Sequence, residues 1–223
     1  MFDLSNKNKS TKQPIYWKIY KFYFSKKRWY SFKSIKIKVE PTVFHPALFF
    51  TTKILLRYTF QLNIQGKKIL ELGAGSGMIS AISSKNGAEV TSTDINPAAI
   101  SSMRESRAVN NLSFEIIQSD LFQKIPLQIF DYILLNPPYF KGAPRTDRDK
   151  AFYCGDNFEY FYNLFEQIQK YITHRTEVYM LLSDDCNIQK IQNISNTKIF
   201  YWESVHQELV WGELYIIFKI QLI

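Results

Sequence analysis

Cysteine is scarce in this chain, and the two cysteines that it has, Cys154 and Cys186, predict no special chemistry. They are too few for a disulfide framework and lack the spacing of metal ligands. Long apolar runs are also missing, since no stretch approaches the roughly 20 apolar residues that a membrane-spanning helix needs. Lysines interrupt the apolar residues near the N-terminus, which excludes a signal-peptide core there. We therefore expect a cytoplasmic protein with no membrane span and no metal.

Positive charge is unevenly distributed along the sequence. Residues 1–40 carry 11 of the 28 Lys and Arg residues but only two of the 20 Asp and Glu residues, a net charge of +9, so the remainder has a net charge of −1. A strongly basic segment suits an anionic partner such as RNA. A solvated extension that keeps the protein soluble explains the same charges equally well.

The N-terminal segment contains some structural signals. Residues 1–13 are polar and lysine-rich, which is typical of disorder. The apolar spacing from Pro14 to about Phe24 predicts a helix, and the alternation in residues 35–39 predicts a half-buried edge strand. Aromatic residues between the lysines can stack on unpaired bases, but we favour a flap that packs on the domain. We divide the chain into an N-terminal extension, residues 1–40, and one domain, residues 41–223.

Strands and helices are predicted to alternate through this domain. The expected strands are 68–72, 88–93, 114–118, 130–136, 176–183, 197–205 and 213–221, and the expected helices are 47–60, 77–86, 97–109, 157–172 and 185–194. Such alternation predicts an α/β fold, a doubly wound and mostly parallel sheet with helices on both faces. Asn96 can cap a helix that begins at Pro97, and Asp156 with Glu159 predicts a capping box.

A glycine loop, residues 73–77, follows the first strand of the alternation. Glycines let the backbone approach a ligand, and the helix that follows offers free N–H groups. The loop reads Glu71-x-Gly73-Ala74-Gly75-x-Gly77. A dinucleotide fingerprint would need glycine in place of Met78, and the Gly-Lys-Ser/Thr of a P-loop is missing. The loop therefore predicts a nucleotide-type site that holds neither a pyrophosphate nor a nucleoside triphosphate.

Two acidic residues follow the next two strands. Asp94 ends one strand, where a carboxylate can accept both hydroxyl groups of a ribose. Asp120 follows the third strand, where it could accept from an adenine amino group. Both could instead be ordinary turn residues, and this alternative is stronger for Asp120. Together with the glycine loop, the acids predict a nucleoside cofactor at the carboxyl edge of the sheet.

The motifs resemble those of the class I S-adenosylmethionine-dependent methyltransferases. More narrowly, they are similar to the methyltransferase small domain group, which includes HemK-type glutamine methyltransferases and several base N-methyltransferases. The resemblance extends from about Phe44 to the C-terminus and implies a Rossmann-like, seven-stranded sheet with a C-terminal antiparallel hairpin. It is carried by Glu71–Gly77, Asp94-Ile95-Asn96-Pro97, Ser119-Asp120-Leu121 and Asn136-Pro137-Pro138-Tyr139.

The resemblance implies S-adenosylmethionine as cofactor and assigns roles to matching residues. Glu71 and the glycines would surround its methionine part, Asp94 would hold the ribose, and Ile95 would pack on the adenine. The adenine edge would contact Asp120 and Leu121, while Asn136 would touch both cofactor and substrate. The cofactor residues are thus Glu71, Gly73, Ala74, Gly75, Gly77, Asp94, Ile95, Asp120, Leu121 and Asn136, and the candidate substrate residues are Phe44, His45, Phe140 and Arg145.

The tetrapeptide Asn136-Pro137-Pro138-Tyr139 predicts the atom that is methylated. Amide and exocyclic amino nitrogens are poor nucleophiles, because their lone pair is delocalised. The side-chain oxygen of Asn136 and the carbonyl of Pro137 can accept hydrogen bonds from such a nitrogen, and Tyr139 can stack on its planar group. The two prolines stiffen the turn. No cysteine is placed to attack carbon, and the clustered acids and histidines of metal-assisted O-methylation are missing.

The sequence leaves the substrate open. The acceptor could be a glutamine side chain of a protein or an exocyclic amino group of a base in RNA. Alternatives are adenine N6 of DNA and a catalytically silent module that keeps the fold. The chain lacks the long N-terminal helical domain of bacterial release-factor enzymes, and the acidic-Thr pair of that group is not recognisable at Thr51-Thr52. We expect a monomer that acts on a macromolecule.

Overall fold

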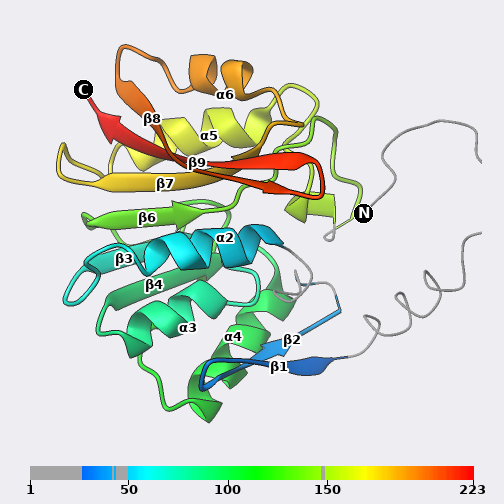
Figure 1. Cartoon of the computed structure of the whole chain (residues 1–223), viewed down its shortest axis with the longest axis vertical. Helices are drawn as coiled ribbons and strands as arrows, with labels where there is room; N and C mark the ends of the chain where they lie inside the picture. The colour runs from blue at the N-terminus through cyan, green and yellow to red at the C-terminus, as the bar shows by residue number, and fades with distance from the viewer. Residues whose placement is uncertain (1–26, 42, 44–49, 147–148) are drawn as a thin grey trace, which may run out of the picture.

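The computed structural model describes residues 27–41, 43, 50–146 and 149–223 (Figure 1). The helix predicted between Pro14 and Phe24 lies outside the described residues. So do Phe44 and His45, and so does the predicted start of the helix 47–60. In the described part of the chain, no helix has the length and apolar character needed to cross a membrane.

A seven-stranded sheet forms the centre of the fold. The first five strands in spatial order are parallel, and β9 runs antiparallel to both β7 and β8. The predicted doubly wound, mostly parallel, Rossmann-like sheet with a C-terminal antiparallel hairpin is therefore confirmed. The spatial order is β5 (Glu115–Gln118), β4 (Glu89–Asp94), β3 (Lys68–Leu72), β6 (Tyr132–Leu135), β7 (Glu177–Ser183), β9 (Glu213–Leu222) and β8 (Phe200–Val210).

Helices cover both faces of this sheet (Figure 1). Alternate residues of β3 divide between two cores, since Ile69 packs on one face while Leu70 and Leu72 pack on the other. The core of the first face includes residues of α2 (Phe50–Thr59), α3 (Met78–Lys85) and α4 (Pro97–Val109). The core of the second face includes residues of α5 (Glu159–Ile168) and α6 (Ile188–Ile194), and the short helix η1 (Asp149–Ala151) precedes α5.

The ends of two helices test the predicted caps. The side chain of Asn96 accepts a hydrogen bond from the amide of Ala98, and Pro97 takes the first position of α4, as predicted. The prediction of a capping box formed by Asp156 and Glu159 is wrong. Phe158 occupies the N-cap of α5 with a positive φ of 64°. The Glu159 carboxylate instead accepts hydrogen bonds from the backbone and side chain of Asn157.

Several boundaries also differ from the prediction. Helix α5 is shorter than the predicted range 157–172. The prediction was too long because the apolar spacing continues to Tyr171 and Ile172, which are buried in the core although they lie beyond the end of the helix. Strand β8 begins and ends later than 197–205 and reaches Val210. A bulge between Ser204 and His206 shifts its register against β9, so the alternation in the sequence is interrupted there.

A separate two-stranded hairpin precedes the sheet. It consists of β1 (Arg28–Phe32), which the sequence did not predict, and β2 (Ile35–Val39), which it predicted as an edge strand. The other edge of β2 is satisfied by α4. The backbone amide of Lys38 donates to Ser106 Oγ, and that of Lys36 donates to Asn110 Oδ1, both at 2.8 Å.

The hairpin contributes to the core of the first face. Ile35, Ile37 and Val39 are at most 3% exposed and belong to the same cluster as Ile69 and Val90 of the sheet. The aromatic residues Tyr30 and Phe32 pack against that cluster. The division at residues 40 and 41 into an extension and a domain stays a prediction, although β2 is packed as part of the domain.

Removing side-chain volume from the hairpin should therefore weaken the whole fold. We expect Ile37→Ala to lower the free energy of unfolding by about 2–5 kcal/mol, because a fully buried side chain leaves a cavity. Urea denaturation measures this value. Ser31→Ala, on the exposed face of β1, is the matched control and should change it by less than about 0.5 kcal/mol. Equal effects of the two substitutions would show that the hairpin is not part of the core.

Candidate active site

A cavity lies at the carboxyl ends of β3, β4 and β6, where the strand order reverses. Ligands of doubly wound sheets bind at this switch point. Every predicted cofactor residue except Gly77 lines the cavity. Further lining residues come from α2, from the 150–151 segment, from α5 and from the loops and strand ends around the cavity. They include Val43, Thr52, Leu55, Ser76, Thr93, Ser119, Pro138, Lys150, Ala151 and Tyr160.

The glycine loop has the conformation that only glycine adopts readily. Gly73 has a φ of 72°, and a Cβ added there would meet no atom within 4 Å. Gly77 has a φ of 69° and immediately precedes α3. A Cβ at Gly77 would lie 2.5 Å from Cγ of Met103, so this glycine serves close packing against α4. The loop therefore combines one position open to the cavity with one position that fixes helix α3.

Glu71 is a buried residue near the end of strand β3, just before this loop. Its Oε2 accepts hydrogen bonds from the backbone amide of Ser80, at 2.7 Å, and from the Ser80 hydroxyl group. Burial raises the pKa of Glu71 from an ordinary value of 4.5 to about 7, against the two Ser80 hydrogen bonds, which lower it. Glu71 thus ties strand β3 to helix α3 while it lines the cavity.

Asp94 holds the other side of the loop. Its Oδ2 accepts a hydrogen bond from the amide of Gly75, and its Oδ1 accepts one from the amide of Asn96, both at 2.8 Å. Burial raises the pKa of Asp94, and these backbone hydrogen bonds oppose the shift. Carboxylate oxygens have further lone pairs, so hydroxyl groups of a ligand can still bind there. Ile95 is 39% exposed beside it.

Asn136 follows β6 directly and has a fixed orientation. Its Nδ2 donates a hydrogen bond to Oγ1 of Thr51, at 3.0 Å. Its Oδ1 is buried and accepts no hydrogen bond from the described residues. A buried acceptor without a partner is costly, and such groups are frequent at functional sites. The amide of Asn136 therefore presents an unused acceptor beside the glycine loop.

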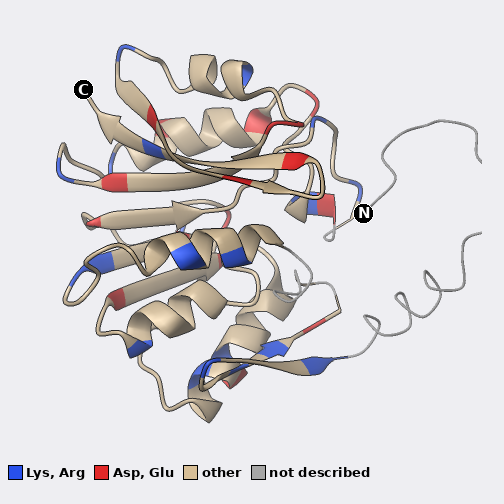
Figure 2. Cartoon of the chain, viewed as in Figure 1, with Lys and Arg blue, Asp and Glu red and all other residues tan. Residues whose placement is uncertain are grey.

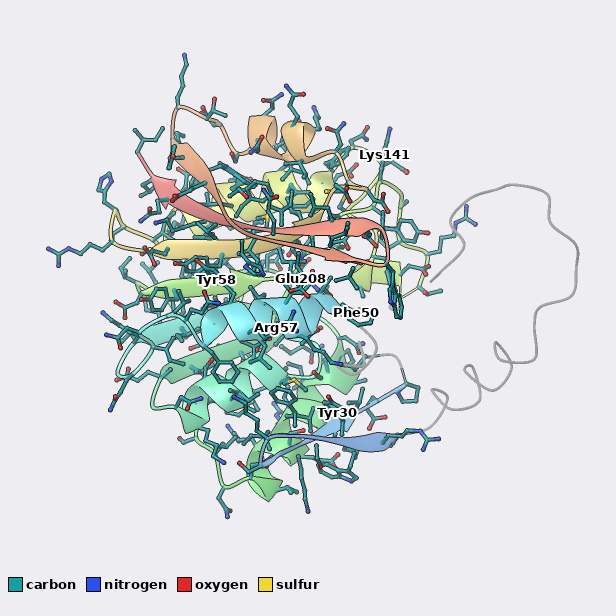
Figure 3. All side chains as sticks on the ribbon, viewed as in Figure 1. Tyr30, Phe50, Arg57, Tyr58, Lys141 and Glu208 are labelled. Atoms are coloured by element: carbon teal, nitrogen blue, oxygen red, sulfur yellow. The ribbon has the colours of Figure 1, made fainter. Side chains whose placement is uncertain are left out.

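Helix α2, which carries Thr51, contacts the C-terminal hairpin through several side chains. Arg57 forms an ion pair with Glu208 of β8 (Figure 3). The ring of Phe50 meets that of Trp211, with centroids 4.7 Å apart. Trp211 lies at the turn of the hairpin and is 81% exposed. These contacts add to the core packing of Ile54, Leu55 and Leu56, which holds the helix that carries Thr51.

Of the other tetrapeptide residues, Pro137 and Tyr139 are not among the residues that line the cavity. Pro138 lines the cavity and Pro137 is buried beside it. Tyr139 packs against the core of the second face, and its ring meets that of Phe140 at 4.9 Å. Burial raises the pKa of Tyr139, and the nearby Glu213 carboxylate adds to the shift.

The remaining candidate substrate residues are less central. Phe140 is held by backbone hydrogen bonds to Phe152 and Cys154. Arg145 is exposed, and its backbone amide donates to Asp149. Neither is among the residues that line the cavity, and their contact with a substrate stays a prediction.

The roles of three residues of the site were not predicted. Thr51 and Ser80 hold Asn136 and Glu71, but these contacts join distant segments that no local pattern reveals. Tyr160 of α5 lines the cavity, and burial raises its pKa, with contributions from Asp120 and Asp94. Its position falls outside the apolar stripe of its helix, so periodicity gave no signal.

The buried carboxyl group of Glu71 should make stability depend on pH. The folded protein keeps its proton up to about pH 7, whereas the unfolded chain releases it above about pH 4.5. The contribution of the protonated Glu71 side chain to the free energy of unfolding is complete below pH 4.5 and is lost as the pH rises through 7. Relative to Glu71→Gln, the free energy of unfolding should fall in this window by up to about 1.4 kcal/mol per pH unit. Urea denaturation across this range measures the difference, and a constant difference would contradict the shift.

Relatives of known name match about half of the chain. A putative protein N5-glutamine methyltransferase of Methanocaldococcus jannaschii is 38% identical over 119 residues, which cover 53% of this chain and 56% of that protein. The ribosomal RNA small subunit methyltransferase C of Hamiltonella defensa is 35% identical over 122 residues, or 54% of this chain and 35% of that protein. The chain thus spans little more than half the length of the first relative, and about a third of the second.

Solved structures share the fold at low identity. The chain superposes on the Mtq2 complex of E. cuniculi, described as methylating the eRF1 termination factor, with a TM-score of 0.63 and 20% identity, covering 82% of this chain and 99% of that one. A T. thermophilus 16S rRNA methyltransferase, solved with AdoMet and guanosine, has a TM-score of 0.60 and 18% identity, covering 89% of this chain and 50% of that one.

The model of one protein family, described as "Methyltransferase small domain", matches residues 34–152. This range contains the glycine loop, both acids and the whole tetrapeptide. The chain belongs to the methyltransferase small domain family.

Proposed function

We propose that the chain is an S-adenosylmethionine-dependent N-methyltransferase that acts on a planar nitrogen of a macromolecule. The observation that carries this proposal is the buried, unpartnered Oδ1 of Asn136 beside the glycine loop. An acceptor in this place fits an N–H group of the substrate. The family match and the named relatives, all methyltransferases, support the same reaction.

The lining of the cavity fits the cofactor. The open position at Gly73 admits a ligand close to the backbone, and the carboxylate of Asp94 can accept from ribose hydroxyl groups. Ile95 and Leu121 provide apolar contacts on either side of the same edge, and Asp120 provides an acceptor. When bound, S-adenosylmethionine supplies an electrophilic methyl group. The chain supplies the position and orientation of the acceptor.

Asn136 and its neighbours would activate that acceptor. Hydrogen bonds from the substrate nitrogen to Asn136 Oδ1 and the Pro137 carbonyl would return electron density to nitrogen and direct its lone pair. The ring of Tyr139 would pack on the planar group. No strong base is needed, since the product can lose its extra proton to solvent. Positioning and electrostatic preorganisation would provide most of the rate.

Glutamine amides and exocyclic base amino groups share this chemistry. Both present a planar nitrogen with two N–H donors, so one pair of acceptors serves either. One relative is named as a glutamine methyltransferase and another as a ribosomal RNA methyltransferase. We therefore propose that the acceptor is one of these two, carried by a protein or by RNA in the cytoplasm.

Labelled methyl transfer to a fractionated cell extract tests the function. We expect labelled S-adenosylmethionine to modify either the protein or the RNA fraction. Asn136→Ala should lower transfer at least 100-fold, because removing a preorganised hydrogen-bond group at a reacting centre costs about this factor. Calorimetric binding of S-adenosylmethionine should largely survive in this variant. Unchanged turnover in Asn136→Ala would overturn the mechanism, and no cofactor binding in the intact chain would overturn the function.

Thr51 should act as a positioning residue. In Thr51→Val the shape of the side chain is kept, but Asn136 Nδ2 loses its partner and the amide can rotate. We expect kcat to fall about tenfold, the cost of roughly one hydrogen bond, with little change in the KM for S-adenosylmethionine. Thr51→Ser, which keeps the hydroxyl group, should restore kcat. Equal kcat values in the valine and serine variants would contradict this role.

A further inference from the structure

The turn of the C-terminal hairpin extends past the edge of the sheet at which the cavity lies. In the antiparallel pairing of β9 with β7, Tyr215 lies opposite Ser183, the last residue of β7. The ladder between β8 and β9 continues beyond this point to the pair of Val210 and Glu213. Strand β7 runs parallel to β6, and β6 ends directly before Asn136. The turn therefore lies on the same side of the sheet as the acceptor amide (Figure 1).

The start of β9 lies beside the tetrapeptide. Burial raises the pKa of Tyr139, and the neighbouring side chains that add to the shift include Glu213 and Asp185. At the turn itself, the ring of Trp211 meets that of Phe50 at the start of α2. A ligand bound to the turn is thus close to the residues that we propose to hold the acceptor nitrogen.

Trp211 occupies the turn in a conformation that its residue type rarely adopts. Its φ is 53°, and that of Gly212 is 90°. A two-residue hairpin turn with positive φ at both positions favours Asn-Gly or Asp-Gly. Phe158 also has a positive φ, but it is only 8% exposed, so core burial offsets the strain. Trp211 is 81% exposed and gains no comparable burial, and Leu209 is 69% exposed. A bulky, strained and exposed residue in this place indicates a functional constraint.

The charge around the turn is negative. Residues 199–218 contain Glu203, Glu208 and Glu213 but no Lys or Arg. In Figure 2 the turn of the hairpin likewise carries no basic residue. Asp184 and Asp185 follow β7, are exposed, and belong to a stretch, residues 176–189, that also lacks Lys and Arg. Among the described residues, no cation forms an ion pair with Asp184, Asp185 or Glu213.

These carboxylates are held in place by the fold. The side chain of Glu213 accepts a hydrogen bond from the Tyr215 hydroxyl group at 2.6 Å, and that of Asp184 accepts one from the backbone amide of Leu214 at 2.9 Å. Burial raises the pKa of Asp185, and the like charges of Glu213 and Asp184 add to the shift. The three carboxylates therefore stand close together, and a cation that binds beside the turn meets groups that are already positioned.

We propose that the turn of the C-terminal hairpin, with Leu209 and Trp211, binds the segment of a protein substrate that flanks the methylated glutamine. This docking rests on the proposed function, with a glutamine amide as the acceptor. The exposed Trp211 ring and Leu209 fit an apolar residue of that segment, and the carboxylates fit a Lys or Arg beside it. A nucleic acid would bring phosphates against these carboxylates, and neither residues 199–218 nor residues 176–189 offer a Lys or Arg to offset them.

Labelled methyl transfer to the RNase-treated protein fraction of a cell extract tests this docking with the full-length chain. We expect Trp211→Asn to raise the apparent KM for the protein fraction about tenfold, as the loss of an interface tryptophan does, with little change in kcat. Because Asn suits the turn, the urea midpoint should not fall. Tyr201→Asn, 57% exposed near the other end of β8, is the matched control and should leave the KM unchanged.

The carboxylates should make the KM depend on salt. Asp184→Asn combined with Asp185→Asn removes two charges but keeps the side-chain oxygen that accepts from Leu214. We expect the apparent KM of this double variant to rise about fivefold at low salt, the effect of two exposed ion pairs, and to change less with added salt than that of the parent. Glu166→Gln, an exposed acid on α5, is the control and should behave like the parent.

The outcomes distinguish this docking from the reaction itself. Label in the RNA fraction alone would overturn the docking and leave the proposed function intact. So would a fall in kcat without a rise in KM in Trp211→Asn, because a residue that acts only through Phe50 and Thr51 would have that effect. Equal KM values in the Trp211 and Tyr201 variants, or self-association that depends on Trp211 while the KM does not, would also overturn it. Label in neither fraction would overturn the proposed function.

Discussion

The orientation of one side-chain amide determines what this site can do. If Asn136 were rotated by half a turn, it would present a donor to the cavity, and a substrate N–H group would be repelled. The hydrogen bond from Nδ2 to Thr51 selects the other orientation. Thr51 belongs to α2, whose buried face packs in the core of the first face and whose Phe50 and Arg57 contact Trp211 and Glu208 of the C-terminal hairpin. The C-terminal hairpin therefore contributes to the acceptor site without contacting Asn136.

The carboxylates of the cavity have structural duties in addition to any role in binding. Glu71 joins β3 to α3 through Ser80, and Asp94 joins the glycine loop to the start of α4. Each is stabilised by backbone amides that a helix or loop end would otherwise leave unpaired. A ligand that binds these carboxylates thus contacts groups already fixed by the fold. Little reorganisation is needed at the moment of binding, which favours affinity.

Local signals in the sequence predicted most of the sheet and the cavity. The glycine loop, Asp94 and Asn136 follow buried strands, and parallel topology brings such strand ends together. What the sequence could not predict depends on contacts between distant segments. Strand β1 gains its partner from β2, and its Tyr30 and Phe32 pack against the core of the first face, so the sequence indicated a flap that packs on the domain but not a strand. Phe158 caps α5 with a positive φ, against the preference of its residue type, and overrides the polar signal of Asp156.

The distribution of charge separates two tasks in the molecule. The cavity is lined by Glu71, Asp94 and Asp120, which suit hydroxyl and amino donors but repel phosphate groups. These three acidic residues outnumber Lys150, the basic residue of the lining. Along the sequence, the excess of positive charge is concentrated in residues 1–40, with a net charge of +9, while the remainder of the chain has a net charge of −1. The acceptor geometry that we propose for a planar nitrogen and the excess of positive charge therefore belong to different segments of the sequence.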